Sequence, residues 1–402
     1  MSEWKEYTVQ DLIDQGMLAE PMDGNHGSIH PKSSDYVSEG VPFIMANDLV
    51  NGVVDLINCS FISEKQAKTL KKGFAHPNDV LLTHKATIGR TAIVPNKYET
   101  IILTPQVTYY RVLKGIDNRY LKYYFDSDFF QNTLRNWAGS GSTRAYIGIT
   151  AQRKLPIILP PLNVQTKIAT VLSLLDEKIS LNIAINENLH QLIAAYYAEI
   201  FKECEHTAKI SDYADRVFSG GTPTTSNESY WSGEFKWLSS GETSQKYIVD
   251  TEKTITQAGV DNSSTRLAKK YDTVIASAGQ GHTRGQTSML LTDTYINQSI
   301  IVVESERIYM PFIYWNICGR YEELRVISNS NSIRGSLTTK MISAFTAPKA
   351  DITQISRFSE LAWAAIHEIE KNCNEIARLA ALRDTLLPKL MNGEIDVSEV
   401  KI

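Results

Sequence analysis

The chain has few cysteines, no excess of positive charge and no long apolar run. Its four cysteines are scattered singly along 402 residues and form no CxxC pair. This spacing excludes a disulfide framework and a cysteine-rich zinc site, and it favours a reducing, cytoplasmic environment. No apolar stretch approaches the length that spans a bilayer, and the first ten residues lack the apolar core of a signal peptide. We therefore expect neither a membrane anchor nor a secretory signal.

The net charge of −4 argues, for the chain as a whole, against a nucleic-acid partner. The charge is unevenly distributed. Residues 1–155 carry 17 basic and 16 acidic side chains, residues 206–346 carry 14 of each, and the remaining segments supply the acidic excess. Any contact with DNA must therefore come from local patches, or a partner must supply positive charge.

The sequence also lacks a recognisable catalytic constellation. GQGHTRG (279–285) is the nearest approach to a phosphate-binding loop, but it has no lysine and no hydroxyl residue after its last glycine. There is no HExxH or GxSxG motif, and the eight histidines are not spaced as metal ligands. LPPL (159–162) lacks the Asn or Asp and the aromatic residue that a base-nitrogen methyltransferase needs. We expect a recognition protein that holds no cofactor or metal of its own.

The sequence alternates between two kinds of segment. Short β-type runs such as VLLTH (80–84) and SIIVVE (299–304) are separated by Gly, Asn, Ser and Pro, which predicts α+β domains with twisted mixed sheets. Long stretches with helical periodicity and few breakers follow each of these regions. The predicted order is a domain at 1–158, a helix at 159–205, a second domain at 206–346 and a second helix with a tail at 347–402.

Both helical segments carry a heptad seam, and the two seams are offset by 190 residues. Steps that alternate between four and three predict a coiled coil. Asn182 and Asn372 occupy equivalent seam positions, where a buried amide penalises wrong registers; the alternative places Asn182 and Asn186 at a solvated edge. The predicted seam consists of Ile168, Leu172, Leu175, Ile179, Asn182, Leu189, Ile355, Phe358, Ile369, Asn372, Ile376 and Leu379.

The globular segments repeat at nearly the same interval. NDVLLTHKATIGRTAIV (78–94) resembles YDTVIASAGQGHTRGQTSM (271–289), and TPQVTYYRV (104–112) resembles NQSIIVVE (297–304), with Gln106 and Gln298 in register. Such a duplication predicts a pseudo-two-fold repeat. Because domains and helices alternate, the second helix should run antiparallel to the first. The domains would then lie at opposite ends of a rod about 60 Å long.

Equivalent polar loops recur in the two domains. Arg, Lys, Gln and His on glycine-flanked turns are side chains that reach base edges and phosphates, and small hydroxyl residues can bind phosphates. The alternative for each residue is an ordinary polar loop. The candidate DNA contacts of the first domain are His84, Lys85, Thr87, Arg90, Ser140, Ser142, Thr143 and Arg144. Those of the second domain are Gln280, His282, Thr283, Arg284, Ser330, Asn331, Ser332 and Arg334.

The helical segments carry motifs of a known family. LPPLNVQTKIATVLSLLDEKISLN (159–182) and LRDTLLPKLMNGEI (382–395) resemble the central and C-terminal regions of type I restriction–modification specificity subunits. SGGTPTT (219–225) is also typical, whereas the first domain has DGNHG (23–27) instead. The second helix also departs from the family, because no second Pro-Pro-Leu precedes it. The matching residues are Pro160, Pro161, Leu162, Gln165, Ile168, Leu172, Asp176, Ile179, Asn182, Arg383, Leu386, Leu387, Pro388, Leu390, Gly393 and Glu394.

The resemblance implies a non-catalytic protein with two target-recognition domains, each reading half of an interrupted sequence in double-stranded DNA. The coiled coil would set the gap and dock methyltransferase subunits, two in number, that carry S-adenosylmethionine. Restriction or motor subunits would join them and use ATP. Two rival functions stay open on the residues alone: an enzyme with divergent motifs, which would bind S-adenosylmethionine by itself, and a scaffold whose globular ends bind proteins.

Overall fold

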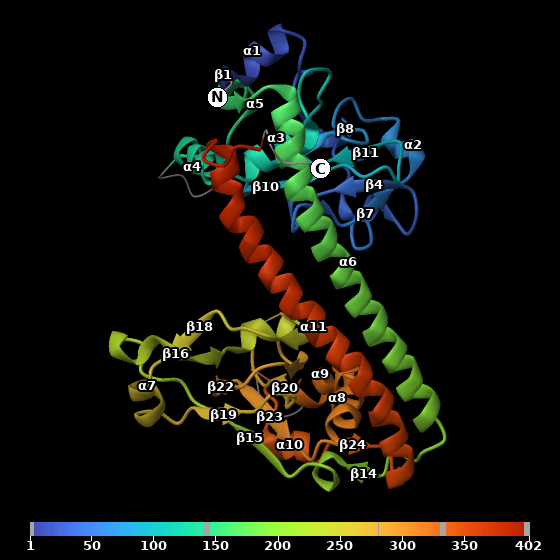
Figure 1. Cartoon of the computed structure of the whole chain (residues 1–402). Helices are drawn as coiled ribbons and strands as arrows, with labels where there is room; N and C mark the ends of the chain where they lie inside the picture. The colour runs from blue at the N-terminus through green and yellow to red at the C-terminus, as the bar shows by residue number, and fades with distance from the viewer. Residues whose placement is uncertain (1–3, 140–144, 280, 330–334, 398–402) are drawn as a thin grey trace. The chain divides into compact units, whose positions relative to one another are not determined.

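A computed structural model describes residues 4–139, 145–279, 281–329 and 335–397. The chain divides into two compact units: unit 1 comprises Met1–Glu177 and Leu379–Ile402, and unit 2 comprises Lys178–Arg378. Each unit combines sheets with helices (Figure 1), so the predicted α+β fold is confirmed. The compact units take in parts of both long helices, and the predicted domain limits at residues 158, 205 and 346 stay a prediction.

The strands of unit 1 form two main sheets. They are β1 (Lys5–Thr8), β2 (Met22–Asp23), β3 (Tyr36–Val37), β4 (Val41–Ile44), β5 (Leu49–Val50), β6 (Val53–Val54), β7 (Ser60–Ile62), β8 (Phe74–Ala75), β9 (Val80–Lys85), β10 (Thr87–Ile93), β11 (Ile101–Leu103), β12 (Val107–Tyr110) and β13 (Pro156–Leu159). One sheet has the order β10-β9-β12-β2 and the other the order β3-β7-β4-β11-β8. The pairs β1-β13 and β5-β6 form two-stranded ladders.

Unit 2 repeats this arrangement. Its strands are β14 (Ala208–Lys209), β15 (Arg216–Ser219), β16 (Trp231–Leu238), β17 (Tyr247–Ile248), β18 (Lys253–Ile255), β19 (Arg266–Ala268), β20 (Thr273–Ala276), β21 (Thr287–Leu290), β22 (Thr294–Ile296), β23 (Ile300–Glu304) and β24 (Thr346–Ala347). The sheets have the orders β15-β23-β20-β21-β17 and β18-β16-β22-β19, and β14 pairs with β24. Strands β4 and β11 pair in parallel in unit 1, as do β16 and β22 in unit 2. The shared strand order confirms the duplication.

The strand register corrects one predicted equivalence. Val107 pairs with the fourth residue after Asp79, and Ile300 pairs with the fourth residue after Asp272. Val107 and Ile300 are therefore equivalent, which makes Ser299 the counterpart of Gln106. The predicted alignment of Gln106 with Gln298 is wrong by one residue, because matching identical side chains ignored the alternation of faces along the strand.

A glycine at equivalent positions replaces the missing GGTP motif of the first domain. A Cβ at Gly220 would approach the carbonyl oxygen of Ile296 to 2.1 Å, and a Cβ at Gly24 would approach that of Leu103 to 1.8 Å. Both glycines let the backbone pass against the end of the parallel strand pair. DGNHG in unit 1 therefore allows the same close backbone approach as SGGTP in unit 2.

The helices are of two kinds. Unit 1 has α1 (Val9–Asp14), α2 (Glu64–Ala67), α3 (Asn118–Asp126), α4 (Asp128–Trp137) and α5 (Ile149–Gln152), with 3₁₀ turns η1 (Gly27–Ile29), η2 (Ser33–Asp35) and η3 (Ala46–Asp48). Unit 2 has α7 (Gln257–Asp261), α8 (Met310–Cys318), α9 (Tyr321–Asn329) and α10 (Thr339–Ser343), with η4 (Ile210–Asp212), η5 (Glu228–Tyr230) and η6 (Ser240–Ser244). The long helices α6 (Leu162–Phe201) and α11 (Ile352–Met391) contribute residues to both units.

Each long helix begins at a local signal. Pro160 and Pro161 directly precede α6, and proline fits the first turn of a helix because the N–H it lacks would have no partner there. At α11, Asp351 accepts from the Gln354 N–H at 2.9 Å, and the Gln354 side chain accepts from the Asp351 N–H at 3.2 Å. This reciprocal cap replaces the family's second Pro-Pro-Leu.

The two long helices pack antiparallel within unit 2. Asn182 Nδ2 donates to Glu375 Oε2 at 2.8 Å, and Asn372 Nδ2 donates to Asn186 Oδ1 at 2.9 Å. Partner numbers fall along α11 as they rise along α6, which defines the antiparallel direction. Asn182 and Asn186 are buried rather than at a solvated edge, with 0% and 9% of their surface exposed.

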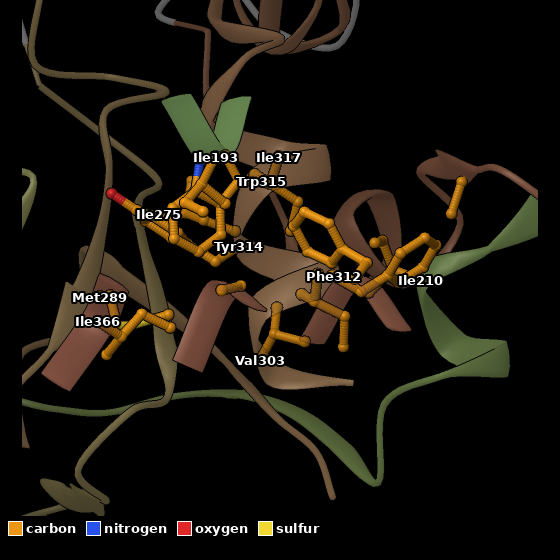
Figure 2. Packing of buried hydrophobic residues seen from close by; sticks show 14 of the residues in the cluster. Ile193, Ile210, Ile275, Met289, Val303, Phe312, Tyr314, Trp315, Ile317 and Ile366 are labelled. Atoms are coloured by element: carbon orange, nitrogen blue, oxygen red, sulfur yellow. The ribbon is translucent and has the colours of Figure 1, made fainter. Parts of the chain in front are cut away.

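The predicted seam residues lie at two levels of burial. Ile168, Leu172, Asn182, Ile355, Phe358, Ile369, Asn372 and Leu379 are buried, and Leu175, Ile179, Leu189 and Ile376 are half-buried. In unit 2 the buried positions join a large apolar core shared by α6, α8 and α11. Figure 2 shows part of it, including Ile193 of α6, Trp315 of α8 and Ile366 of α11.

Candidate nucleic-acid interface

In unit 1 the β9–β10 hairpin is hydrogen-bonded to the segment 145–147. The Ile147 N–H donates to the His84 carbonyl at 3.0 Å, and the Ala86 N–H donates to the Ala145 carbonyl at 3.1 Å. Ala145 directly follows the predicted loop 140–144, which lies outside the described residues. The hairpin turn and the chain leaving that loop are therefore held side by side.

The hairpin depends on a glycine that docks it on α4. Gly89 has a φ of +91°, and a Cβ there would approach the side-chain oxygen of Gln131 to 2.2 Å. Gln131 Nε2 also donates to the Gly89 carbonyl at 2.9 Å. A larger residue at position 89 would lift the turn away from α4.

Unit 2 joins the equivalent described segments in the same way. The Leu337 N–H donates to the Ser277 carbonyl at 2.9 Å, which is the counterpart of the hydrogen bond to His84 in unit 1. The Arg284 guanidinium donates to the Asn329 side chain, and a Cβ at Gly335 would approach Arg284 Nη1 to 2.1 Å. Asn329 and Gly335 are the described residues on either side of the predicted loop 330–334, and both lie against Arg284.

His84 and Arg284 are buried, with 1% and 7% of their surface exposed. His84 Nδ1 lies 3.0 Å from the Ile147 carbonyl, which can only accept, so Nδ1 carries the proton. Burial lowers the pKa of His84 and keeps the ring neutral at pH 7. These positions favour a structural role for both residues over the predicted contact with DNA.

The remaining described candidates of unit 1 lie nearer the surface. Lys85 is half-buried at the end of β9, while Thr87 and Arg90 are exposed on β10. The Arg90 guanidinium donates two long hydrogen bonds, both of 3.4 Å, to the carbonyls of Ala46 and Leu49. Lys85 and Thr87 are thus the candidates best placed to meet a ligand.

In unit 2 the loop between β20 and β21 is fastened to α9. Tyr321 donates its hydroxyl to the His282 carbonyl at 2.8 Å, and Arg325 donates to the Arg284 carbonyl at 3.4 Å. The His282 side chain is exposed and Thr283 is half-buried. The other candidates lie outside the described residues: Ser140, Ser142, Thr143, Arg144, Gln280, Ser330, Asn331, Ser332 and Arg334.

Tyr146 was not predicted as a contact, yet the structure places it beside the hairpin. Its side chain is 48% exposed, and Lys85 Nζ lies 5.9 Å from the centre of its ring. An exposed aromatic ring next to a lysine is a platform on which a base can stack. The sequence signal was an aromatic residue two positions after Arg144, at the edge of the predicted loop.

The described residues lack two features, a metal site and a membrane-spanning helix. In the ranges from residue 4 to 397 that the structure covers, no group of three His, Cys, Asp or Glu side chains is arranged to hold a metal ion. Within the same ranges no helix has both the length and the apolar composition needed to cross a membrane. The described residues form two related α+β units, and both long helices contribute residues to each of them.

Comparison with known proteins shows what the chain is similar to. Residues 1–191 match the family described as "Type I restriction modification DNA specificity domain". The EcoR124I/EcoR124II specificity subunit of Escherichia coli is 25% identical over 254 residues, which are 60% of this chain and 62% of that protein. The MjaIX specificity subunit of Methanocaldococcus jannaschii is 22% identical over 427 residues, covering 98% of this chain and 95% of the relative.

A solved structure shares the fold. The type I restriction–modification S subunit from M. genitalium aligns with a TM-score of 0.59 and 16% identity, covering 97% of this chain and 96% of that one. Residues 1–191 thus match a type I restriction–modification DNA specificity domain, and nearly the whole chain is similar to a specificity subunit of such a system.

Proposed function

We propose that the chain is the non-catalytic DNA-sequence specificity subunit of a type I restriction–modification complex. Each repeat reads one half of a bipartite target in double-stranded DNA. Methyltransferase subunits with S-adenosylmethionine and restriction subunits with ATP supply the chemistry in the cytoplasm. The observation that carries the proposal is a hydrogen bond shared by both repeats, from Ile147 to His84 in unit 1 and from Leu337 to Ser277 in unit 2. It occurs in a chain whose residues 1–191 match a DNA specificity domain.

The first half-site is assigned to unit 1. Lys85 and Thr87 supply donors from the hairpin, and Tyr146 supplies an exposed ring beside them. Lysine and hydroxyl donors can contact phosphates or base edges, while the ring contributes stacking. Arg144 adds a side chain that can form two hydrogen bonds with guanine in the major groove.

The second half-site is assigned to unit 2. His282 and Thr283 present side chains from the β20–β21 loop, which α9 holds in place through Tyr321. Arg334 occupies the position that corresponds to Arg144 in the repeat, 190 residues further along the chain. Different side chains on equivalent loops let the two repeats read different bases.

The long helices are assigned the tasks of setting the gap and docking the methyltransferase. Leu181, Ile185 and Leu192 of α6 are 54%, 36% and 60% exposed. Their spacings of four and seven residues place them on one face of the helix. An exposed apolar face of this kind needs a partner. A basic partner would also supply the phosphate contacts that the nearly neutral repeats lack.

The proposal is tested with the full chain and its methyltransferase partner. Mapping methylated adenines in a host carrying the system would give the target sequence. A gel-shift assay would then compare that duplex with a scrambled duplex of equal length and composition. We expect retention of the specific duplex alone, at a salt concentration that suppresses non-specific binding.

Two results would contradict the proposal. Equal retention of the two duplexes would indicate a scaffold without sequence reading. Methyl transfer by the isolated chain, or binding of S-adenosylmethionine to it, would indicate an enzyme. The matched variants Thr87→Ala and Thr69→Ala separate specific from general effects, because both threonines are exposed and only Thr87 lies on the hairpin.

A further inference from the structure

Unit 1 contains a cavity that shares Lys85 with the proposed DNA contacts and otherwise lies outside them. It has a volume of about 310 Å³ and lies between the segment that follows β2, the end of β9 and the turn after β11. Sites for small molecules begin near this size. The residues that carry the argument are His30, Tyr36, Lys85, Thr104 and Gln106, all of which line it.

Two polar atoms buried at this cavity have no hydrogen-bond partner among the described residues. One is Thr104 Oγ1, on a residue that is 4% exposed, and the other is His30 Nδ1. Buried polar groups are almost always hydrogen-bonded, and those that are not call for an explanation. The Gln106 amide also has no side-chain partner in the described ranges. A ligand in the cavity would satisfy these groups.

The charges at the cavity favour an anionic ligand. Lys85 contributes an ammonium group that forms no ion pair within the described part of the chain, and no Asp or Glu lines the cavity. Asp23, close by in sequence, is already ion-paired with Lys72 and with His26, the latter at 2.9 Å. Thr104, Gln106 and His30 can all donate hydrogen bonds, as Lys85 does.

The cavity also has a flat aromatic wall. The Tyr36 ring lies 5.9 Å from the Phe43 ring, packs against the apolar cluster that contains Phe43 and Ile62, and also lines the cavity. A lone inorganic anion would leave this wall and most of the volume unused. We infer that the cavity binds one nucleotide, with its phosphate at Lys85 and Thr104 and its base against Tyr36.

The duplicated unit does not repeat these features. The position equivalent to Lys85 is Ala278, which has no charge. The position equivalent to Thr104 is Asn297, whose side-chain oxygen already accepts from the Ser299 N–H at 2.9 Å. The unsatisfied groups of unit 1 are therefore not a by-product of the fold that both repeats share. The bound nucleotide can be part of the DNA strand or a free molecule. Binding of a nucleotide of the DNA strand rests on the proposed function.

Thr104→Val is the sharpest test, because valine keeps the shape and removes only the hydroxyl. Thr108→Val is its matched control: Thr108 Oγ1 is also buried without a partner among the described residues, but Thr108 does not line the cavity. Neither change should lower the melting temperature, since neither hydroxyl has a hydrogen bond to lose. Lys85→Gln is paired with Lys154→Gln, a change at an exposed lysine that is not part of the cavity lining.

The first arm measures binding of the four deoxynucleoside 5′-monophosphates and of inorganic phosphate to the full chain by calorimetry. We expect at least one mononucleotide to bind more tightly than phosphate. Thr104→Val and Lys85→Gln should each weaken it about tenfold, and the two control variants should leave it unchanged. The second arm measures retention of the specific duplex in the presence of the methyltransferase.

The mononucleotide and duplex measurements together show whether the bound nucleotide is free or part of the DNA strand. Loss in the mononucleotide arm alone indicates a free nucleotide, and loss in the duplex arm indicates a nucleotide of the strand. If Thr104→Val behaves like Thr108→Val in both arms, the inference is overturned. That result is distinguishable from failure of the proposed function, in which the unmodified chain itself does not separate specific from scrambled duplex.

Discussion

Arg383 Nη1 of α11 donates to Asp176 Oδ1 of α6 at 2.9 Å, joining the two motif residues of the long helices within unit 1. The same carboxylate accepts from the Tyr123 hydroxyl at 2.7 Å. An offset of 190 residues maps this pair onto Ile366 and Ile193, which are buried together in the core of unit 2. The ion pair of unit 1 therefore corresponds to two buried isoleucines in unit 2.

Asp176→Ala should destabilise unit 1 by about 1–3 kcal/mol, because it leaves the Tyr123 hydroxyl and the Arg383 guanidinium without their shared acceptor. Urea unfolding measures the change. Asp384→Ala is the matched control, since Asp384 also accepts from Arg383 but its side chain is 66% exposed. The control should change stability by less than about 0.5 kcal/mol. Equal losses would contradict the central role of Asp176.

The buried asparagine pair predicts a non-additive pair of substitutions. Asn372→Leu alone should cost about 1–3 kcal/mol, because the Asn186 side chain loses its partner in an apolar seam. Adding Asn186→Leu should recover most of that loss, since neither amide then remains buried without its partner. Unfolding followed by tryptophan fluorescence would report it, because unit 2 holds four of the six tryptophans. A double variant that loses as much stability as the two single variants together, or more, would contradict the pairing.

Asp272 predicts a loss of stability on raising the pH. Burial raises its pKa to about 7, further supported by the charge of Glu304, while Lys269 and Arg216 oppose the rise. The folded state therefore holds a proton that the unfolded state releases near pH 4, and stability falls between about pH 4 and 7. Asp272→Asn imitates the protonated form and should stabilise unit 2 above pH 7 by about 2–4 kcal/mol, with little effect at pH 4.

Asp79, the equivalent residue of unit 1, provides a control in which the same substitution should change the stability in the opposite direction. Asp79 accepts from Arg111 Nε at 2.9 Å and from Nη2 at 2.8 Å, so its charge is compensated. Asp79→Asn should destabilise unit 1 at pH 7 by roughly 1–3 kcal/mol. Unfolding measured for both variants at pH 5 and pH 8 checks the pair. A stabilising effect of both substitutions at pH 8 would show that the local partners do not decide the sign.

The two loop arginines predict separate effects on the half-sites. Arg144→Ala and Arg334→Ala should each weaken reading of a different half-site by roughly 1–3 kcal/mol, the range for a bidentate contact with a base. Competition gel shifts with targets altered in one half at a time measure this. A uniform loss on all sequences would assign the arginines to phosphates instead.

The helix pair predicts control of the gap. Inserting one heptad into α6 and one at the facing position of α11 adds about 10 Å of helix, equivalent to about three base pairs. The preferred gap should change while the half-site sequences stay the same, which selection from a randomised gapped library would reveal. Insertion into one helix only is the control, and it should abolish binding by breaking the register. An unchanged gap in the double insertion would contradict this role.

Sequence reasoning succeeded where the signal was local and periodic. Seam spacing predicted the helices α6 and α11, and the 190-residue offset predicted the duplication, because helix and strand periods are written in neighbouring residues. Lys85 and Thr87 lie at the β9–β10 hairpin, and their contact with DNA stays a prediction. Sequence reasoning misaligned Gln106, since strand register depends on pairing with a distant strand.

The sequence by itself determined the repeat, the helical seams and the loops that carry polar side chains, because each is a property of consecutive residues. Only the tertiary structure decided which polar side chains are enclosed. Arg284 is buried by Asn329 and Gly335, and the cavity beside Lys85 is formed with Tyr36 and Thr104. Burial and unsatisfied hydrogen bonds arise from segments far apart in the chain, and no local pattern encodes them.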